Sequence, residues 1–464
     1  MIISDEECFL AQEAMRFALG EGMDGVRVTL SKSVSNSLTM LDGEIDNTSR
    51  CADSSLTFCL FADSRYGTFS TNRLEMSSLR SFLRKACETV RLMEQDPFRG
   101  LPQKERMASD AVTGLEAGLW DGRVLEITPE QRLEAIKSMR LKQLEGCVGL
   151  DGEGKTSEGI KWSVASEEDD YADYAEEIYL IDSQGFEGRS LESSISCSSE
   201  VTVLAEDGRR YSAYWWDASS KCGVIHPEIC AATALGKALE KIGPQSIGSG
   251  VYRAVVDGNI ASKLLSPVID ALGAFSLQQK MSFLVGSKGK KVFSEGLTLT
   301  DKAREKGKQG ARMFDSEGVA TCDRVIIEDG RVKNYFVNTY MSRKMGEAPT
   351  VEDISRPVLS AWNGFGKDGE KALTLEDIVR ECGEGVLIGE FNGGNCNPVT
   401  GDYSFGVAGF VIRGGKVCEP FREMLMTGNI VELWNSLLAV GDDARECGRW
   451  KLPTLAFEGV SLNA

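Results

Sequence analysis

The feature that most constrains the fold is an alternation of apolar and polar residues close to the N-terminus. Apolar side chains recur at every second position within residues 26–30, 38–40 and 56–60. Since successive side chains of a strand point to opposite faces, this period predicts strands with one buried face. Asp42-Gly43 and Asp63-Ser64 separate these runs and are typical of tight turns. The pattern therefore predicts an antiparallel sheet.

Capping residues locate the helices. Ser4 and Glu7 form a capping box, in which each side chain bonds to the backbone of the other, so we expect a helix that Gly20 ends. Thr128 and Gln131 form a second box, with a proline at the first helical position. Further helices are predicted over residues 74–93 and 226–243, and further strands over 177–181, 196–205 and 210–216.

These elements predict an α+β fold in several regions. Residues 95–114 hold two Pro and two Gly without an apolar period, which indicates a linker. We therefore expect an N-terminal α+β region at 1–94, the linker at 95–114 and a middle α+β region at 115–243. Beyond residue 244 glycine becomes frequent and short apolar runs alternate with turns. This composition predicts a β-rich C-terminal domain over residues 244–464.

The net charge, and the lack of targeting signals, argue against a nucleic-acid-binding, membrane-spanning or secreted protein. The formal net charge is −18, which disfavours direct nucleic-acid binding because phosphate contacts need clustered Lys and Arg. The densest basic stretch, residues 288–291, is followed by acidic residues and is interpreted as solvated surface. No run approaches the ~18 apolar residues of a membrane span, and a secretory signal pattern is missing. The 13 Cys contain no C-x-x-C pair, so we expect a cytoplasmic protein.

Common catalytic motifs are missing from the sequence. The single histidine, His226, precedes a proline and is interpreted as a cap or surface residue. One histidine cannot form a two-His zinc site, and no G-x-S-x-G turn or nucleotide-binding glycine loop accompanies it. Cys396, Cys418 and Cys447 have spacings that match no common zinc module. Motifs alone therefore identify no active site.

Several strings nevertheless occur in an order that resembles one family. They are residues 314–319 (FDSEGV), 342–346 (SRKMG), 400–404 (TGDYS), 440–443 (VGDD) and 453–455 (PTL). With looser agreement in the N-terminal half, the chain resembles the TldD/PmbA family, the so-called modulators of DNA gyrase. The family has a TldD-like branch of zinc peptidases with an H-E-x-x-x-H helix, and a PmbA-like (TldE) branch that lacks this motif and partners the first.

The resemblance places that zinc helix on residues 264–271 (LLSPVIDA). The two histidine positions become Ser266 and Ala271, and the glutamate position becomes Pro267. Serine is a poor zinc ligand, alanine is none, and proline cannot accept a proton from water. Cys447 resembles the family's cysteine ligand. The resemblance thus implies the PmbA-like branch, with no catalytic residue, metal or cofactor in this chain.

The family implication is a cytoplasmic complex in which a TldD-like subunit holds zinc and cleaves unfolded or extended peptides. This chain would then shape the chamber and restrict access, and whether it also forms a homo-dimer stays open. Two alternatives remain. One is a self-sufficient hydrolase using carboxylates, and the other is an interaction protein acting on gyrase without a peptidase role. The candidate carboxylates, whose simpler interpretation is turn formation, are Asp315, Glu317, Asp402, Asp442 and Asp443.

Overall fold

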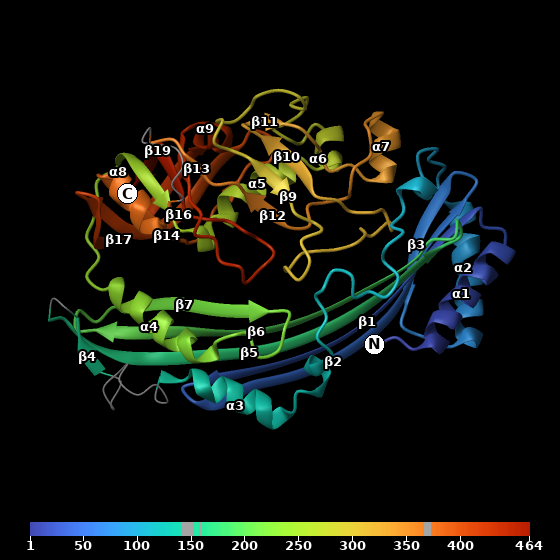
Figure 1. Ribbon diagram of the computed structural model, residues 1–464, viewed down its shortest axis with the longest axis horizontal. Coiled ribbons are helices and arrows are strands. Elements are labelled where there is room, and N and C mark those ends of the chain that lie inside the picture. Colours follow the sequence, from blue (N-terminus) through green and yellow to red (C-terminus); the bar gives the residue numbers. More distant parts are fainter. Residues whose placement is uncertain (142–152, 157–158, 366–372) are drawn as a thin grey trace. The chain divides into compact units, whose positions relative to one another are not determined.

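The computed structural model describes residues 1–141, 153–156, 159–365 and 373–464 (Figure 1). The chain forms two compact units. The first contains residues 1–239, 304–321 and 342–346, and the second contains residues 240–303, 322–341 and 347–464. The predicted α+β class is confirmed. None of the described helices has the length and apolar character needed to cross a bilayer.

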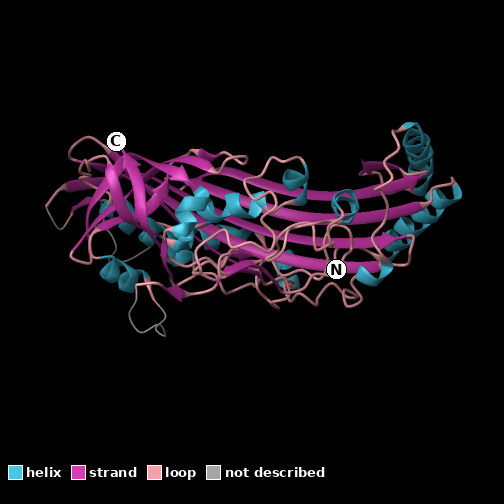
Figure 2. Cartoon of the chain, turned by 90° about the horizontal axis from the view of Figure 1, so that it is seen from above, coloured by secondary structure: helices cyan, strands magenta, loops and turns pink. Residues whose placement is uncertain are grey.

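The first unit is built on a seven-stranded antiparallel sheet with the order β3-β2-β1-β5-β6-β7, in which β4 pairs with β5. Its longest strands lie side by side in Figure 2. The apolar runs at 26–30 and 38–40 belong to one strand, because β1 continues through the polar residues between them. The strands are β1 (Gly25–Leu41), β2 (Glu44–Ala62), β3 (Arg65–Thr71), β4 (Glu153–Lys155), β5 (Lys161–Asp182), β6 (Glu187–Ala205) and β7 (Arg210–Ser219).

Both capping boxes form as predicted, at Ser4–Glu7 and Thr128–Gln131. The helices of this unit are α1 (Asp5–Gly20), α2 (Met76–Leu92), α3 (Pro129–Met139) and α4 (Cys230–Glu240), with short 3-10 helices η1 (Lys104–Arg106), η2 (Gly122–Glu126) and η4 (Pro227–Ile229). Buried residues of α1 and α2 share one apolar cluster with the start of β1, and buried residues of α3 share another with Leu38 and Met40. His226 lies on the surface before η4, where its Nδ1 is 3.1 Å from Glu228.

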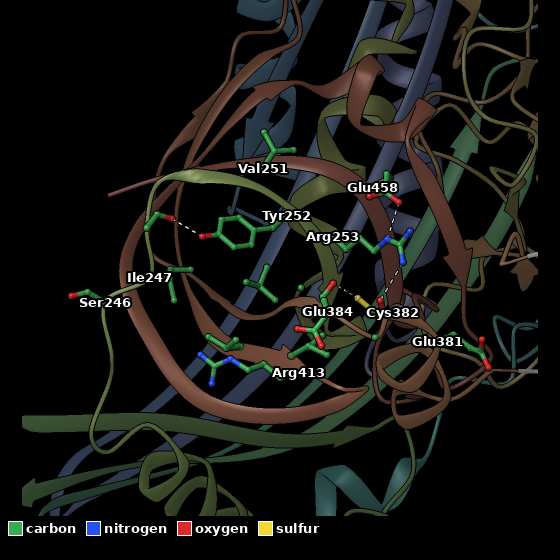
Figure 3. Close-up of a pocket in the computed structure, with 16 residues that line it drawn as sticks. Ser246, Ile247, Val251, Tyr252, Arg253, Glu381, Cys382, Glu384, Arg413 and Glu458 are labelled. Carbon is green, nitrogen blue, oxygen red and sulfur yellow. Dashed lines mark hydrogen bonds and ion pairs between the residues drawn. The ribbon is translucent and has the colours of Figure 1, made fainter.

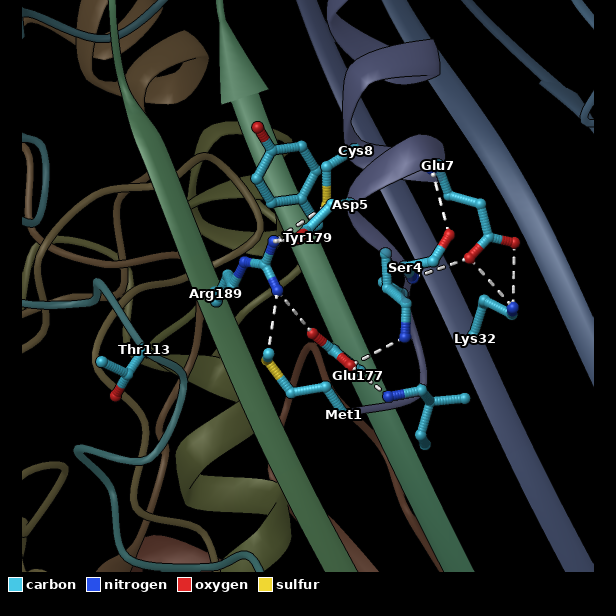
Figure 4. Close-up of polar contacts among 12 residues, drawn as sticks. Met1, Ser4, Asp5, Glu7, Cys8, Lys32, Thr113, Glu177, Tyr179 and Arg189 are labelled. Carbon is cyan, nitrogen blue, oxygen red and sulfur yellow. Dashed lines mark hydrogen bonds and ion pairs between the residues drawn. The ribbon is translucent and has the colours of Figure 1, made fainter.

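Buried carboxylates on one face of β5 attach the covering segments to the sheet. The fully buried Glu177 accepts hydrogen bonds from the backbone N–H groups of Ile2 and Ile3 at 2.6 and 2.9 Å, and pairs with Arg189 at 3.1 Å (Figure 4). Four residues earlier on the same face, Asp173 pairs with Arg132 of α3 at 2.5 Å. The N-terminal segment is therefore held by hydrogen bonds to a buried carboxylate and α3 by an ion pair, in addition to apolar contacts.

The second unit is β-rich, as predicted. Strands β8, β14, β16, β17 and β19 pair in turn, and β19 also pairs with β8, so these strands form a closed ring. A separate sheet has the order β11-β10-β9-β12. The strands are β8 (Gly250–Val256), β9 (Leu299–Asp301), β10 (Arg324–Glu328), β11 (Arg331–Val332), β12 (Pro357–Leu359), β13 (Trp362–Asn363), β14 (Gly385–Phe391), β15 (Asn395–Cys396), β16 (Asp402–Arg413), β17 (Lys416–Asn429), β18 (Leu437–Val440) and β19 (Leu455–Asn463).

Its helices are η5 (Gly258–Ile260), α5 (Ser262–Ala271), α6 (Ala274–Gln278), α8 (Leu375–Cys382) and α9 (Ile430–Asn435). Helix α7 (Thr339–Met345) begins in the second unit and ends in the first.

Candidate functional site

Helix α5 carries the positions where the family's zinc ligands would lie. Leu264, Leu265 and Val268 are fully buried and form its apolar face. The fully buried Trp434 of α9 donates its indole N–H to the carbonyl oxygen of Leu264 at 3.2 Å. At the other end of α5, the Ser282 hydroxyl donates to the carbonyl of Ala271 at 2.6 Å. The helix is therefore fixed at both ends by side-chain hydrogen bonds.

Helix α5 begins at Ser262, so Pro267 does not mark its start. Pro267 lies inside the helix, where it lacks the N–H that would bond to the carbonyl four residues earlier. Ser266 and Pro267 are half-buried, whereas Ala271 is only 3% exposed. The two positions that match the family's histidines thus differ in their surroundings, because Ser266 borders solvent and Ala271 lies in the core.

Cys447 lies in a loop that contacts the segment before α5. Its neighbour Arg445 donates to the Asn259 side chain at 3.3 Å. The flanking residues Glu446 and Gly448 are held by Arg356, whose guanidinium bonds to the Glu446 carboxylate at 2.8 Å and to the Gly448 carbonyl at 3.1 Å. Arg356 is 1% exposed. Sequence reasoning missed this arginine, since no pattern indicates that a charged side chain is buried there.

The residues around α5 do not fit a zinc ion. Ser266 offers a hydroxyl, and Pro267 and Ala271 offer no side-chain donor, whereas zinc sites use thiolate, imidazole and carboxylate ligands. Within the described residues, no group of three His, Cys, Asp or Glu side chains is placed to hold a metal ion. We therefore derive no zinc-dependent step for this chain.

The candidate carboxylate Asp315 forms a turn. Its Oδ1 accepts the backbone N–H groups of Glu317 at 2.9 Å and Val319 at 3.0 Å, and Gly318 has a φ of +83°. Burial, with Glu317 as a like charge beside it, raises the pKa of Asp315 to about 6. Its Oδ2 is buried and has no hydrogen-bond partner in the described part of the chain. Because its Oδ1 accepts two backbone N–H groups of the turn, the geometry indicates a structural role.

A second copy of this turn lies at residues 182–186. Asp182 Oδ1 accepts the N–H groups of Gln184 at 2.8 Å and Phe186 at 3.0 Å, and its Oδ2 is likewise buried without a partner among the described residues. The two turns share the sequence D-S-x-G and contact each other, with the rings of Phe186 and Phe314 5.7 Å apart. Asp315 is therefore one half of a paired turn that closes a small apolar cluster.

Asp402 lies in a turn, as its simpler interpretation suggests, but its side chain bonds to other side chains and not to backbone N–H groups. Its carboxylate accepts from the Thr400 hydroxyl at 2.7 Å and from the Asn429 amide at 3.0 Å. The backbone N–H groups of the turn are accepted by the Asn397 side chain instead, which bonds to the N–H of Val399 at 2.9 Å. The predicted tight turn itself is present, with Gly401 at a φ of +82°.

The last candidate pair, Asp442 and Asp443, also has a structural position. Asp443 accepts the backbone N–H and the hydroxyl of Thr454 at 2.8 and 2.7 Å, which closes the loop that holds Cys447. The Asp442 backbone N–H donates to the carbonyl of Leu373 at 2.9 Å, and its side chain is exposed. The five candidate carboxylates thus lie in three segments, at residues 315–317, at residue 402 and at residues 442–443, and Asp315, Asp402 and Asp443 each accept hydrogen bonds from neighbouring groups of the chain.

A cleft of ≈900 Å³ opens beside the start of β8 in the second unit (Figure 3). Its two arginines are already paired, Arg253 with Glu458 at 2.8 Å and Arg413 with Glu419 at 2.7 Å. Burial raises the pKa of the Cys382 thiol to about 11, so at neutral pH this sulfur is protonated and a weak nucleophile. The cleft is lined by residues 246–248, 251–253, 381–386 and 411–413 and by Glu458.

Comparisons with known proteins agree with this architecture. Residues 249–464 match the family described as the PmbA/TldA metallopeptidase C-terminal domain. Metalloprotease PmbA of Escherichia coli O157:H7 is 25% identical over 452 residues, which cover 96% of this chain and 94% of that protein.

Two solved structures resemble the whole chain. A protein from Bacteroides thetaiotaomicron, named for a modulator role on DNA gyrase, is 34% identical with a TM-score of 0.90 and full coverage of both chains. TldE from Thermococcus kodakarensis is 19% identical with a TM-score of 0.78, over 98% of this chain and 100% of that one, and so shares the fold. Together with the ordered motifs and the α+β architecture, these matches show that the chain belongs to the PmbA/TldD family.

Proposed function

We propose that this chain is a non-catalytic subunit of the PmbA/TldE type, acting in the cytoplasm with a TldD-like partner that binds zinc and cleaves unfolded or extended peptides. The observation that carries the proposal is the contrast within α5. Its buried face and its anchors Trp434 and Ser282 are intact, while positions 266, 267 and 271 hold no histidine or glutamate. A retained scaffold without the reacting groups supports a role in assembly.

Peptide recognition in such a complex needs no specific sequence. An extended peptide can add to an exposed strand edge through main-chain hydrogen bonds, which are the same for every residue type except proline. In the proposed complex, this chain binds no zinc and helps to enclose the peptide. The hydrolysis itself needs an activated water and a base, and Pro267 supplies neither.

The two alternatives find less support. A self-sufficient carboxylate hydrolase would need candidate acids that are free to act on a substrate. Asp315, which has Glu317 beside it, instead accepts the backbone N–H groups of its own turn. A role at gyrase rests on the name given to the Bacteroides thetaiotaomicron protein. The net charge of −18 disfavours direct contact with the DNA on which gyrase acts.

The direct test is cleavage of an unstructured peptide by this chain alone, by a TldD-like protein from the same source alone, and by the mixture. We expect cleavage by the partner, none by this chain, and a changed rate or product pattern in the mixture. EDTA-sensitive cleavage by this chain alone would overturn the proposal, as would a mixture identical to the partner by itself.

Elemental analysis of the purified chain supplies a second test. We expect no stoichiometric zinc, with the TldD-like protein prepared in parallel as the positive control. About one zinc per chain that disappears in Cys447→Ser would contradict the proposal.

A further inference from the structure

Two buried thiols of the first unit meet between the sheet and helix α4. Cys197 lies within β6 and Cys230 is the first residue of α4, and their exposed fractions are 2% and 0%. Their two Sγ atoms are 3.6 Å apart, and both cysteines are free. The chain between them contains β7 and the segment 220–229, so a bond between the two sulfurs would close a loop around both.

The distance between the two sulfurs allows a disulfide to form with a small movement. A disulfide has an S–S length of about 2.05 Å, so the Sγ atoms need to approach each other by about 1.5 Å. Cys197 is held in an inner strand, where it lies opposite Tyr171 of β5 and Asp217 of β7. Cys230 lies where the short helix η4 meets α4. Because the first turn of a helix opens more readily than an inner strand, we expect Cys230 to be the residue that moves.

In the reduced state both thiols have hydrogen-bond partners. The Sγ of Cys197 lies 3.8 Å from the carbonyl oxygen of Asp217, and the Sγ of Cys230 lies 3.9 Å from that of His226. The hydrogen bond to Cys230, together with burial, raises the pKa of Cys197, so its thiol stays protonated at neutral pH. A protonated thiol is a poor nucleophile, and burial keeps oxidants in solution away from both sulfurs. Oxidation of the pair therefore needs a local opening of the structure.

The segment 220–229 is the part of the chain that can supply this opening. Its half-buried residues Cys222 and Ile225 pack against the apolar cluster that contains both buried thiols. Its side chains Val224 and Ile229 are 54% and 46% exposed, so much of the segment contributes little to the core. Segments with few buried apolar contacts open at low free-energy cost. Since Cys230 follows the segment directly, displacing the segment exposes this thiol first.

We propose that Cys197 and Cys230 are a redox-sensitive pair, which a peroxide converts into a reversible disulfide that ties the start of α4 to β6. With the segment displaced, the Sγ of Cys230 attacks one oxygen of hydrogen peroxide. The O–O bond breaks, a water leaves with the thiol proton, and a sulfenic acid remains on Cys230. The Sγ of Cys197 then attacks the sulfenic sulfur, the S–O bond breaks, and a second water leaves as the S–S bond forms. Two thiols are oxidised, and one hydrogen peroxide is reduced to two waters.

The bond would restrict the segment 220–229 and the first turn of α4. A link between residues 197 and 230 removes conformations in which the chain between them moves away from the sheet. Helix α4 is also the last element of residues 1–239, after which the chain continues into the second unit. Oxidation would thus fix the place where the chain leaves the large sheet. This inference does not depend on the proposed role in peptide processing.

The test is thiol mapping of the full, folded chain. The protein is treated with hydrogen peroxide, its remaining thiols are alkylated after denaturation, and its proteolytic peptides are identified by mass. We expect a pair of peptides joined through residues 197 and 230, which dithiothreitol separates again. Oxidation should also slow the hydrogen exchange of residues 222–230 by about tenfold or more. Lack of the joined pair under conditions that oxidise the exposed Met281 would overturn the proposal.

Two variants separate this pair from other buried thiols. Cys230→Ala should form no joined pair, and its hydrogen exchange should not change on oxidation. Cys87→Ala is the matched control, because this thiol is 1% exposed but belongs to the cluster under α1 and α2, and the 197–230 bond should form in it as in the wild type. A bond from Cys222 to one of the buried thiols in place of the 197–230 bond, or unaltered hydrogen exchange once that bond has formed, would contradict the proposal.

Discussion

The sheet of the first unit and the strand ring of the second bury their interiors differently. Along one face of β5 the buried positions include Asp169, Asp173 and Glu177, which are 1%, 3% and 0% exposed. The buried positions of α5 itself are apolar, and the fully buried Trp434 packs edge-on against Phe457 at 5.5 Å. One core contains carboxylates with polar partners, whereas the other relies on close packing of apolar side chains.

The difference follows from how each sheet is covered. A ring of strands encloses its own apolar interior, so shape complementarity is sufficient there. The long open sheet is covered by separate segments that come from different parts of the sequence, and a buried carboxylate of β5 fixes where each of two such segments lies. Glu177 holds the N-terminal segment and Asp173 holds α3 in this way. We infer that polar burial here specifies position, while its contribution to stability is modest.

The largest effect is expected from the apolar core. Trp434→Ala should lower the free energy of unfolding by about 3–5 kcal/mol, because it removes a large buried ring and leaves a cavity. Trp434→Phe keeps much of the packing and loses the hydrogen bond to Leu264, so about 1 kcal/mol is expected. Hydrogen exchange of α5 and α9 would measure both. Equal losses from the two variants would show that the hydrogen bond, and not the packing, holds α5.

The second-largest expected effect comes from replacing a buried acid, and it raises the stability of the protein. Burial raises the pKa of Asp169 to about 7, although the Ser199 hydroxyl donates to it at 2.6 Å. Since the folded state holds this proton more tightly than the unfolded chain, stability falls as pH rises from about 4 to about 7. Asp169→Asn should abolish this fall and stabilise the protein at pH 8 by about 2–4 kcal/mol.

Urea unfolding at several pH values measures this change. The exposed Glu206→Gln is the control and should leave the pH profile unaltered. A profile of Asp169→Asn that matches wild type would mean that the buried acid carries no such cost, which would remove the contrast between the two cores.

A smaller loss is expected at the carboxylate that holds the N-terminus. Glu177→Gln should cost about 1–3 kcal/mol, because the neutral amide cannot form the ion pair that Oε1 makes with Arg189, and its uncharged oxygen is a weaker acceptor for the N–H groups of Ile2 and Ile3. Protease resistance of the N-terminal segment should fall more than global stability does. The control is Glu176→Gln on the opposite face of β5. A loss as large as that of Trp434→Ala would show that the carboxylates stabilise the sheet as strongly as apolar packing stabilises the ring.

The smallest expected loss of stability comes from a turn in the second unit. Gly401 has a φ of +82°, and an added Cβ would lie 3.2 Å from Ile430, so Gly401→Val should lower stability by about 1 kcal/mol or more. Gly236→Ala is the matched control, because it lies inside α4 with nothing within 4 Å of an added Cβ. That variant should be neutral or slightly stabilising. An unchanged melting temperature for Gly401→Val would show that the turn tolerates other conformations.

The parts of the fold that sequence reasoning found are those set by near neighbours. The capping boxes at Ser4 and Thr128 need only residues three positions apart, and the turn at Asp42-Gly43 needs only two. The pairing of β1 with β5 joins residues far apart in sequence, and no local pattern encodes it. For the same reason the partners of Glu177 could not be inferred.

The candidate site was found by family resemblance, and its details depended on contacts that the sequence does not display. Residues 264–271 do form a helix with a buried apolar face. Arg356 is buried beside the Cys447 loop, and Asn397, not Asp402, accepts the backbone N–H groups of its turn. Both details depend on which polar groups the fold brings together. The repeat of D-S-x-G at 182–185 and 315–318 was visible in the sequence, but only the structure shows that the two turns meet.

The interleaving of the two units in the sequence has a consequence for how the protein is made. Residues 304–321 and 342–346 belong to the first unit, although most of the chain between residues 240 and 346 belongs to the second. During synthesis the large sheet cannot complete its packing when residue 239 has left the ribosome, because Phe186 still lacks Phe314. The apolar side chains of that cluster therefore stay exposed until Phe314 has been synthesised. Exposed apolar surface of this kind is what chaperones bind on nascent proteins.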